Sequence, residues 1–439
     1  MEKILDLAKK VAEEAEVYMV KSTETPVVWE ANRLKMMESG ESTSISLRII
    51  RNGRIGFAST TRLDQPQALV EMAVETSQFG AEARFELPSL QEYPAVDVYD
   101  AEASKIDIDD MVNMGNGLIE TLLAHTPELV CEASIGKAES EVRIINSRGG
   151  QAGYRKSFFD ISVEGNLIRG TDMLFVGEMD VSCHPIRDFK KIAESTISQL
   201  ELAKRTASIS TGRMPVILTP KGVINALGTP MALAVNGKMV LEGASPLGGK
   251  IGQQLFDARL TIWDDPTVSY LPASRPCDSE GVASRRTTLI DNGTVGGFLY
   301  DLQTAALAGT SSTGSGVRAR GSLPSPSTSA VIVKEGDAGY GEMIRDIKEG
   351  LVVEMLIGAG QGNVLGGEFG GNVLLGYKIE NGELVGRVKD TMISGNIYES
   401  LKEIRAVGRE AQWVAGSFKT PAICLSNLSI ASKGQKSCL

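Results

Sequence analysis

The sequence contains very few of the residues that most zinc sites require. Only two histidines, His125 and His184, occur among 439 residues. A zinc peptidase of the H-E-x-x-H kind needs two imidazoles on one helical face and a glutamate between them to activate water. The chain has no such motif, and the sequence therefore excludes this way of holding zinc.

Long apolar runs and concentrated positive charge are also missing. No segment approaches the roughly 20 apolar residues that span a bilayer, and residues 1–16 are typical of a charged amphipathic helix rather than a signal sequence. The net charge is −10, from 55 acidic and 45 basic residues. This average field repels a nucleic-acid backbone. We expect a cytoplasmic protein without direct contacts to membrane or nucleic acid.

The cysteines form no C-x-x-C pair, and their odd number favours reduced thiols. They are Cys131, Cys183, Cys277, Cys424 and Cys438. Because Cys438 is next to last, the four-residue prenylation signal is absent. Cys183 and His184 could form a nucleophilic dyad, but neighbouring side chains on a strand point to opposite faces, which disfavours it. His125 precedes Pro127 in a polar segment and is interpreted as a surface residue.

The length favours two or three domains, and the order of elements predicts an α+β fold in two domains. Residues 1–207 are expected to form an N-terminal domain of helices and antiparallel strands. Residues 212–439 are expected to form a C-terminal, glycine-rich, β-dominated domain. The boundary is placed in the short polar segment 206–215, because such a composition buries little.

Period and turn residues predict the elements of the first domain. A hairpin is expected around Asn52-Gly53, since both central residues of this turn need positive φ, and the polar segment 84–100 is expected to be a surface loop. Helices are predicted over 1–20, 65–80, 107–123 and 185–207, and strands over 129–135, 141–146, 151–164 and 173–182.

The second half is predicted to be mainly strands. A strand is expected at 216–218, a helix from Pro220, a hairpin over 286–301, a loop over 308–326, and helices over 342–349 and 397–407. The stretch 358–396 combines many glycines with strand-like runs. Such glycines indicate either close approach of another backbone or ligand, or a sharply curved sheet that binds nothing.

Other motifs for catalysis or phosphate binding are incomplete. The segment 243–250 resembles a phosphate loop but has an extra glycine before Lys250. No G-x-S-x-G elbow occurs, and the Ser-rich segment 311–316 is typical of a flexible or backbone-donating loop. Arginines 285, 286, 318 and 320 flank this loop. They could hold a carboxylate or a peptide terminus in bidentate fashion, or they could be solvated loop residues.

Several short motifs in the second half resemble the carboxy-terminal half of the TldD/PmbA family over most of residues 210–432. The matching segments are Asp278–Gly281, Arg285–Gly293, Ser312–Gly316, Gly367-Glu368-Phe369, Gly376–Gly382 and Ser394-Gly395-Asn396. The resemblance implies one of two kinds of subunit. The TldD kind carries H-E-x-x-x-H on a helix and a later cysteine, which hold a metal, and it cleaves peptides. The PmbA kind, also called TldE, lacks these ligands and assembles with the first.

This sequence resembles the PmbA kind. The corresponding helix, near Pro220–Val235, has neither histidine nor glutamate, and the segment Trp413–Lys419 has no cysteine. The resemblance therefore implies no catalytic residue, no metal ligand and no cofactor in this chain, with zinc expected only in a TldD-like partner. It implies a metallopeptidase-related pseudoenzyme that helps to shape a peptide chamber and forms a homodimer when alone.

Candidate substrate-binding residues follow from the resemblance and the loop chemistry. They are Arg286, Ser312, Gly314, Arg318, Gly367, Glu368 and Asn396. Two alternatives stay open. One is an independent peptidase or hydrolase that uses a device without histidine, such as a metal held by carboxylates. The other is a non-enzymatic regulator, because the family is often labelled a modulator of DNA gyrase. The acidic net charge argues against direct DNA contact in this second alternative.

Overall fold

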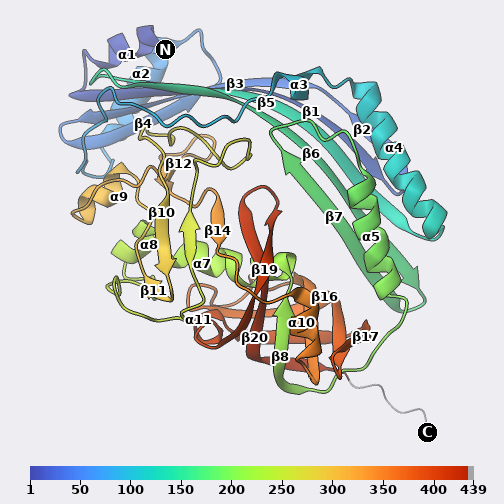
Figure 1. Cartoon of the computed structure of the whole chain (residues 1–439). Coiled ribbons are helices and arrows are strands. Elements are labelled where there is room, and N and C mark those ends of the chain that lie inside the picture. The colour runs from blue at the N-terminus through green and yellow to red at the C-terminus, as the bar shows by residue number, and fades with distance from the viewer. Residues whose placement is uncertain (434–439) are drawn as a thin grey trace.

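The computed structural model describes residues 1–433 and is built on two large sheets. All strands of the seven-stranded sheet lie between residues 14 and 182, and all strands of the eleven-stranded sheet lie between residues 212 and 432. The first sheet arches over the second half of the chain (Figure 1). Helices and largely antiparallel strands occur together, which confirms the predicted α+β class.

The seven-stranded sheet has the strand order β4-β3-β1-β5-β6-β7, with β2 paired to β1. Its strands are β1 (Glu14–Glu30), β2 (Arg33–Met37), β3 (Gly40–Arg51), β4 (Arg54–Thr60), β5 (Val130–Asn146), β6 (Gln151–Arg169) and β7 (Asp172–Ser182). The predicted hairpin is confirmed: Asn52 and Gly53 adopt φ values of 50° and 70° between β3 and β4. The two strands predicted over 129–135 and 141–146 are one continuous strand, β5.

Five helices pack against this sheet. They are α1 (Glu2–Ala8), α2 (Pro66–Ser77), α3 (Ala101–Lys105), α4 (Ile108–His125) and α5 (Lys190–Leu202). In Figure 1, α1 and α2 lie at one end of the sheet, and α4 and α5 lie at the other. Trp29 of β1 lies under α4 and donates a hydrogen bond from Nε1 to Asn116. A Cβ at Gly115 would lie 2.1 Å from this indole ring, so glycine permits the close packing.

The prediction of a helix over residues 1–20 is wrong beyond its first turns. The helix α1 ends at Ala8, and β1 begins at Glu14. Residues 14–20 pair with β3, and residues 16–20 pair with β5 as well. These tertiary hydrogen bonds override a local spacing of apolar residues that fits a helix. The predicted helix over 185–207 is shorter than expected, because α5 begins only at Lys190 and ends at Leu202.

The eleven-stranded sheet has the order β11-β10-β9-β14-β20-β18-β16-β15-β8, with β17 on β16 and β19 on β20. A separate ribbon joins β12 (Gly316–Val317) to β13 (Ser325–Pro326). The strands of the large sheet are β8 (Gly212–Leu218), β9 (Ile262–Asp264), β10 (Thr287–Asp291), β11 (Thr294–Val295), β14 (Val331–Val333), β15 (Glu349–Ile357), β16 (Glu368–Glu380), β17 (Glu383–Arg387), β18 (Thr391–Asn396), β19 (Ile404–Val414) and β20 (Phe418–Ser432).

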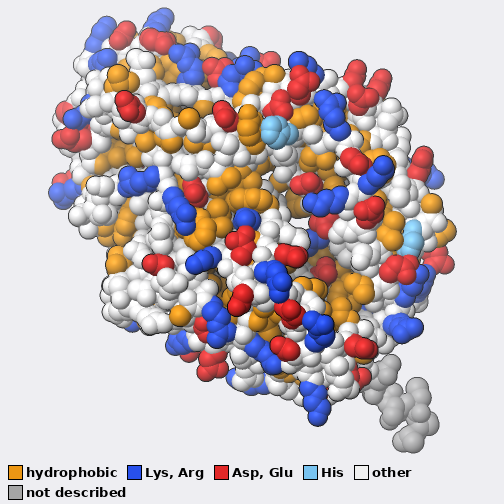
Figure 2. All heavy atoms as spheres, in the orientation of Figure 1, with side chains coloured by type: hydrophobic (Ala, Val, Ile, Leu, Met, Phe, Trp, Pro, Cys, Tyr) orange, Lys and Arg blue, Asp and Glu red, His pale blue; other side chains and the backbone are white. Residues whose placement is uncertain are grey.

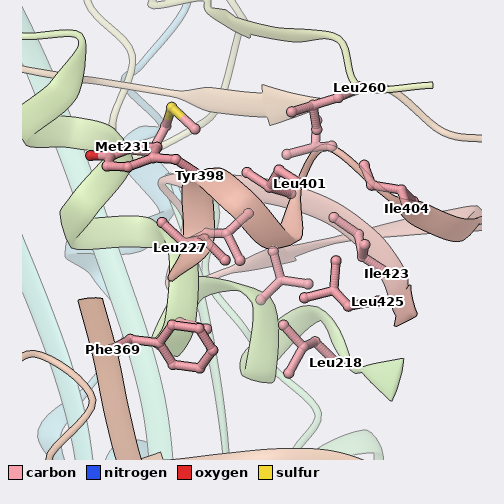
Figure 3. Packing of buried hydrophobic residues seen from close by; sticks show 14 of the residues in the cluster. Leu218, Leu227, Met231, Leu260, Phe369, Tyr398, Leu401, Ile404, Ile423 and Leu425 are labelled. Carbon is pink, nitrogen blue, oxygen red and sulfur yellow. The ribbon is translucent and has the colours of Figure 1, made fainter. Parts of the chain in front are cut away.

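The helices of the second half are short. They are α6 (Pro220–Val223), the π-helix η1 (Ile224–Gly228), α7 (Thr229–Ala234), α8 (Gly237–Leu241), α9 (Leu302–Leu307), α10 (Tyr340–Arg345) and α11 (Ile397–Ser400). Figure 3 shows how side chains from η1 and α7, including Leu227 and Met231, pack beside Phe369, Tyr398 and Leu401. This cluster fixes the helical segment 220–234 on the sheet.

Two predicted helices of the second half end early. The segment 397–407 is helical only to Ser400, and Ile404 already belongs to β19, which pairs with β20. The helix predicted over 342–349 is α10, and Glu349 begins β15. The hairpin predicted over 286–301 is confirmed at its turn, where Asn292 and Gly293 have positive φ between β10 and β11.

The two halves share one apolar core. Buried side chains of α5, such as Leu200, belong to the same cluster as Val352 of β15 and Leu375 of β16. Polar contacts add to it, since Arg387 donates two hydrogen bonds to Asp172, at 2.6 and 2.7 Å. Residues far apart in the sequence therefore hold the arched sheet and the second sheet in contact.

In residues 1–433, no helix has the length and apolar character needed to cross a bilayer. The four cysteines in this range are buried and form no disulfide. Cys438 lies outside the described residues.

Candidate functional site

The segment Pro220–Val235, which the resemblance sets against the metal-binding helix of the TldD kind, directly follows β8. The hydroxyl of Thr219 caps it by accepting a hydrogen bond from the Gly222 N–H, at 3.4 Å, and Pro220 occupies the first turn, where its missing N–H costs little. The helix then changes from α to π over Ile224–Gly228 and returns to α. Single π-turns occur frequently at functional sites, so the backbone form identifies this helix as a candidate site.

Neighbouring strands fix this helix in place. A Cβ at Gly222 would lie 2.4 Å from the Val353 carbonyl oxygen, and the helix can therefore approach β15 only with glycine at this position. Asn225 accepts a hydrogen bond from the Leu356 N–H of the same strand at 3.1 Å. At the far end, the Tyr398 hydroxyl donates to the Pro230 carbonyl oxygen at 3.1 Å.

The accessible side chains of this helix do not fit a metal ion. They include the ammonium of Lys221, the amide of Asn225 and the hydroxyl of Thr229, whereas zinc takes imidazole, thiolate or carboxylate ligands. The residues 413–419 form the tip of the β19–β20 hairpin and supply no thiol. Within residues 1–433, no three His, Cys, Asp or Glu side chains are grouped so that they could hold a metal.

The structure brings three of the predicted site residues together at the start of β16. Gly367 has φ of 83°, and a Cβ there would lie 2.3 Å from the Tyr398 ring. Asn396 donates to the Gly366 carbonyl oxygen at 2.8 Å and caps α11. Glu368 pairs with Asn396 across the β16–β18 ladder, and its side chain is exposed. Gly367 and Asn396 thus shape the backbone, and Glu368 faces solvent.

Three other predicted residues meet in the loop that contains β12. The Ser312 hydroxyl donates to the Tyr300 carbonyl oxygen at 3.1 Å and accepts from the Gly314 N–H at 3.2 Å. Gly314 has φ of 71° and leaves no room for a Cβ beside the Ala283 carbonyl oxygen, at 2.6 Å. Arg318 is buried, and its Nε donates to the Ser279 carbonyl oxygen at 3.1 Å.

Arg318 belongs to a buried ionic network that joins the two halves. Its guanidinium is paired with Glu16 of β1. Arg48 of β3 lies between two carboxylates, 2.9 Å from Glu16 and 2.6 Å from Glu280. The other Glu280 oxygen accepts a hydrogen bond from the Leu302 N–H at 2.7 Å. At most 3% of each of these four charged side chains is exposed, so water cannot screen the charges.

The environment of the network shifts the pKa values of its ionisable groups in different directions. Burial raises the pKa of Glu280 to about 7, although Arg48 opposes this shift. Burial alone would lower the pKa of Arg48, but the nearby Glu16 and Glu280 carboxylates raise it above its ordinary value. Burial lowers the pKa of Arg318. A network of this kind connects β1, β3 and loops of the second half, which are far apart in the sequence.

Arg286 lies outside this network. Its guanidinium stacks on the Trp263 ring, 3.9 Å from the centroid, which is the geometry of a cation–π contact. Its neighbour Arg285, rather than Arg286, donates to the Ser312 carbonyl oxygen.

The two histidines do not activate a thiol. His184 is exposed, lies 2.7 Å from the Asp100 carboxylate, and stacks on Tyr270. Cys183 is buried, and burial raises its thiol pKa to about 11. His125 pairs with Glu201 at 2.5 Å. These contacts agree with the argument against a dyad of Cys183 and His184.

The residues that sequence reasoning missed are Glu16, Arg48 and Glu280. Little signal was present, because Arg48 occupies a polar position of an alternating strand, between Leu47 and Ile49. A charge in a strand that is otherwise buried requires a partner. The sequence alone could not show which carboxylates would reach it.

Comparison with known proteins places these features in a family. A sequence model described as the PmbA/TldA metallopeptidase C-terminal domain matches residues 211–432, and one described as PmbA/TldA metallopeptidase domain 1 matches residues 15–77. An uncharacterized protein of Methanocaldococcus jannaschii is 27% identical over 92% of this chain and 93% of its own. The metalloprotease PmbA of Escherichia coli O157:H7 is 25% identical over 98% of this chain and 94% of its own.

A similar fold is seen in a solved structure. The crystal structure of TldE from Thermococcus kodakarensis superposes with a TM-score of 0.87, covers 98% of this chain and 100% of its own, and has 24% sequence identity. At this level of identity the match shows the fold.

Proposed function

Because the chain belongs to the PmbA/TldD metallopeptidase family, we propose that it is a PmbA/TldE-like subunit that shapes a peptide chamber for a metal-bearing, TldD-like partner. In this proposal the chain is cytoplasmic, binds no zinc of its own, and forms a homodimer when the partner is absent. Its substrates are unfolded or short peptides, which the partner cleaves.

One observation supports this proposal above the others. The helix from Pro220 to Ala234 keeps a detailed backbone form, with a capped start, a π-turn and close packing on β15. The side chains on its accessible face nevertheless include none that could polarise water on a metal. A helix with this backbone but without metal-binding side chains suits a subunit that supports a catalytic partner.

The glycine-rich segment supports a role in contacting peptides through the backbone. Gly358, Gly362 and Gly367 all adopt positive φ, and no atom lies within 4 Å of a Cβ position at Gly360 or Gly362. A surface without side chains lets an extended peptide approach a main chain closely. Binding of this type depends little on the peptide sequence, which suits a chamber that admits varied substrates.

The direct experiment combines this chain with a TldD-kind protein that carries H-E-x-x-x-H. We expect the two chains to co-elute from a sizing column and the mixture to cleave a short unfolded peptide faster than the partner alone. The chain by itself should contain no stoichiometric zinc by elemental analysis and should not cleave the peptide. Absence of both co-elution and stimulation would contradict the proposal.

The two alternatives give different results in the same preparation. An independent hydrolase would cleave peptide without partner and would carry a metal. A gyrase-linked regulator that contacts DNA would give a salt-dependent shift of a DNA duplex, which the net charge of −10 disfavours.

A further inference from the structure

The end of the arched sheet that carries α4 and α5 has one face without a cover. Five side chains on this face lie in register across five neighbouring strands: Met36 of β2, Val28 of β1, Ser134 of β5, Ser162 of β6 and Met179 of β7. Successive side chains of a strand point to opposite faces. Every second residue beyond this row therefore projects from the same face.

The two faces of the sheet differ sharply at this end. The alternate positions, which include Trp29, Cys131, Val163 and Leu174, are buried in the core, and Figure 1 shows α4 and α5 along that side of the strands. The face of Met36 and Met179 has no helix over it. We call it the uncovered face.

Large apolar side chains of the uncovered face are exposed to solvent. The exposed fractions are 41% for Met36, 44% for Val130, 60% for Ile168, 50% for Met173 and 43% for Met179. The register connects these residues, because Ile168 pairs with Met173 across β6 and β7, and Val130 pairs with Asn166 across β5 and β6. They form one continuous surface rather than scattered exposed residues.

The uncovered face is large enough to be an interface. Strands lie about 4.8 Å apart and rise about 3.4 Å per residue, so five strands and four rows of side chains span about 20 Å in each direction. An area on the order of 400 Å² exceeds most exposed apolar patches of monomeric proteins. It is about half of the roughly 800 Å² that one partner contributes to a standard interface.

Two glutamates lie among these apolar side chains. Glu132 of β5 and Glu164 of β6 are directly opposite each other, and both are exposed. Like charges in this position repel each other. Within residues 1–433, neither carboxylate has a cationic partner, whereas nearby Glu128 pairs with Arg169.

The charge pattern of the uncovered face differs from that of an ordinary solvated surface. Figure 2 shows acidic and basic side chains interspersed over the second half of the chain. The rows of side chains on the uncovered face include no lysine or arginine. A surface that docks here must therefore supply the positive charge that the two glutamates lack.

We infer that the uncovered face binds a different protein chain, whose surface places apolar side chains around a lysine or arginine that meets Glu132 and Glu164. Under the proposed function, this chain is the TldD-kind subunit. The inference rests on that proposal, because it names the surface of this chain through which the two subunits assemble.

The glutamates also argue against a second copy of this chain as the occupant. In a two-fold dimer, residues near the axis meet the same residues of the other copy. Glu132 and Glu164 lie between the row of Met36 and Met179 and the row of Val130, so they are near the middle of the face. Face-to-face pairing of two copies would bring four carboxylates together, and like charges across an interface oppose binding.

Methionine oxidation tests whether the partner covers this face. Peroxide converts exposed methionines to sulfoxides, and mass spectrometry measures the rate at each position. Adding a TldD-kind protein that carries H-E-x-x-x-H should slow the oxidation of Met36, Met173 and Met179 at least threefold. Met72 of α2 is 42% exposed and lies outside the face, so its rate should stay the same.

A matched pair of substitutions measures the effect on affinity. Ile168 is 60% exposed on the face, and Ile251 is 59% exposed in a loop of the second half. Binding is followed by the fluorescence anisotropy of the fluorescein-labelled TldD-kind protein. Ile168→Asp should weaken binding about tenfold or more, because it buries a further carboxylate without a partner, and Ile251→Asp should leave the affinity unchanged.

Substitutions of Glu164 test the role of charge separately. Glu164→Lys should weaken binding about tenfold or more, and Glu164→Gln should weaken it less, because glutamine removes the attraction without adding repulsion. The side chain is exposed, so the fold should tolerate both changes. A thermal melt of each variant establishes that it is folded.

The outcomes separate this inference from the proposed function. Equal affinity of folded Ile168→Asp and the unchanged protein, or methionine oxidation that the partner does not slow, overturns the inference and leaves the subunit proposal standing. Dissociation of a homodimer by Ile168→Asp with unchanged affinity for the partner assigns the face to a second copy and also overturns it. Binding that depends on this face without faster peptide cleavage supports the inference and contradicts the chamber role.

Discussion

Replacing Arg48 by methionine should lower the free energy of unfolding by about 3–5 kcal/mol, the usual cost of removing one partner from a buried ion pair. In the structure, Arg48 neutralises Glu16 and Glu280 at 2.9 and 2.6 Å. Methionine fills much of the same space but leaves Glu280 with the Leu302 N–H as its hydrogen-bond donor. The cost therefore comes from an uncompensated buried carboxylate and only to a small extent from lost packing.

Urea unfolding followed by tryptophan fluorescence measures this change, because the midpoint shifts in proportion to the lost free energy. Trp29 reports on the arched sheet, and Trp263 reports on the second sheet. Since the network connects the two halves, signals from single-tryptophan versions of the variant should shift together. A shift confined to one half would show that the network does not couple them.

Arg409→Met is the matched control. Arg409 also forms an ion pair, with Glu342 at 2.7 Å, but both side chains are 52% exposed. Exposed pairs contribute about 0–1 kcal/mol, so this variant should unfold close to the unchanged protein. If Arg48→Met and Arg409→Met cost the same within about 0.5 kcal/mol, the buried network does not stabilise the fold as described.

The remaining predictions concern a pH dependence, a glycine and a thiol. The folded-state pKa of Glu280 is raised to about 7, whereas the carboxyl of an unfolded chain has a pKa of about 4.3. The contribution of the Glu280 carboxyl to folding stability is therefore complete below about pH 4.3 and is lost as the pH rises through 7. The stability difference between the unchanged protein and Glu280→Gln, measured by urea unfolding from pH 5 to 8, should shrink along this range, and a constant difference would refute the assignment. Gly367→Val should cost about 2 kcal/mol or more, because positive φ and the Tyr398 ring both exclude a side chain; an unchanged thermal midpoint would contradict this. Cys183 should react slowly with iodoacetamide at pH 8 in the folded protein, since burial raises its pKa to about 11. The substitution His184→Ala should not alter the alkylation rate. Rapid alkylation that depends on His184 would support a dyad of Cys183 and His184.

The parts of the fold that could be predicted from the sequence are those with strong local signals. The Asn52-Gly53 turn and the Asn292-Gly293 turn were predicted from residues that tolerate positive φ, and both are confirmed. The helix α4 was predicted almost to its ends, from 107 to 123 against the observed Ile108–His125. In the structure the Asp107 side chain caps its start.

The missed features depend on partners far away in the sequence. Residues 14–20 carry a spacing that suits a helix, but their strand neighbours are β3 and β5, and no local pattern identifies a strand more than a hundred residues away. For the same reason, the helix predicted over 397–407 ends at Ser400, because Ile404 already pairs with Leu425 of β20.

The grouping of the motif glycines in the candidate site could be predicted from the sequence, but the partners of its charged side chains could not. The motif residues Gly367 and Asn396 do lie together, because the neighbouring strands β16 and β18 pair at Glu368 and Asn396. Arg318 was considered for its capacity to hold a carboxylate. The structure shows the carboxylate of Glu16 beside it, a contact between residues 302 positions apart. Such a pairing follows only from the arch of the first sheet over the second half.

The measurement that tests the central claim most directly is the rate of peptide cleavage by a TldD-kind metallopeptidase with and without an equimolar amount of this chain, together with the rate for this chain alone. The account predicts no cleavage by the chain alone and faster cleavage by the mixture than by the partner. Cleavage by the chain alone that is lost on chelation of a bound metal, with no effect in the mixture, would contradict it.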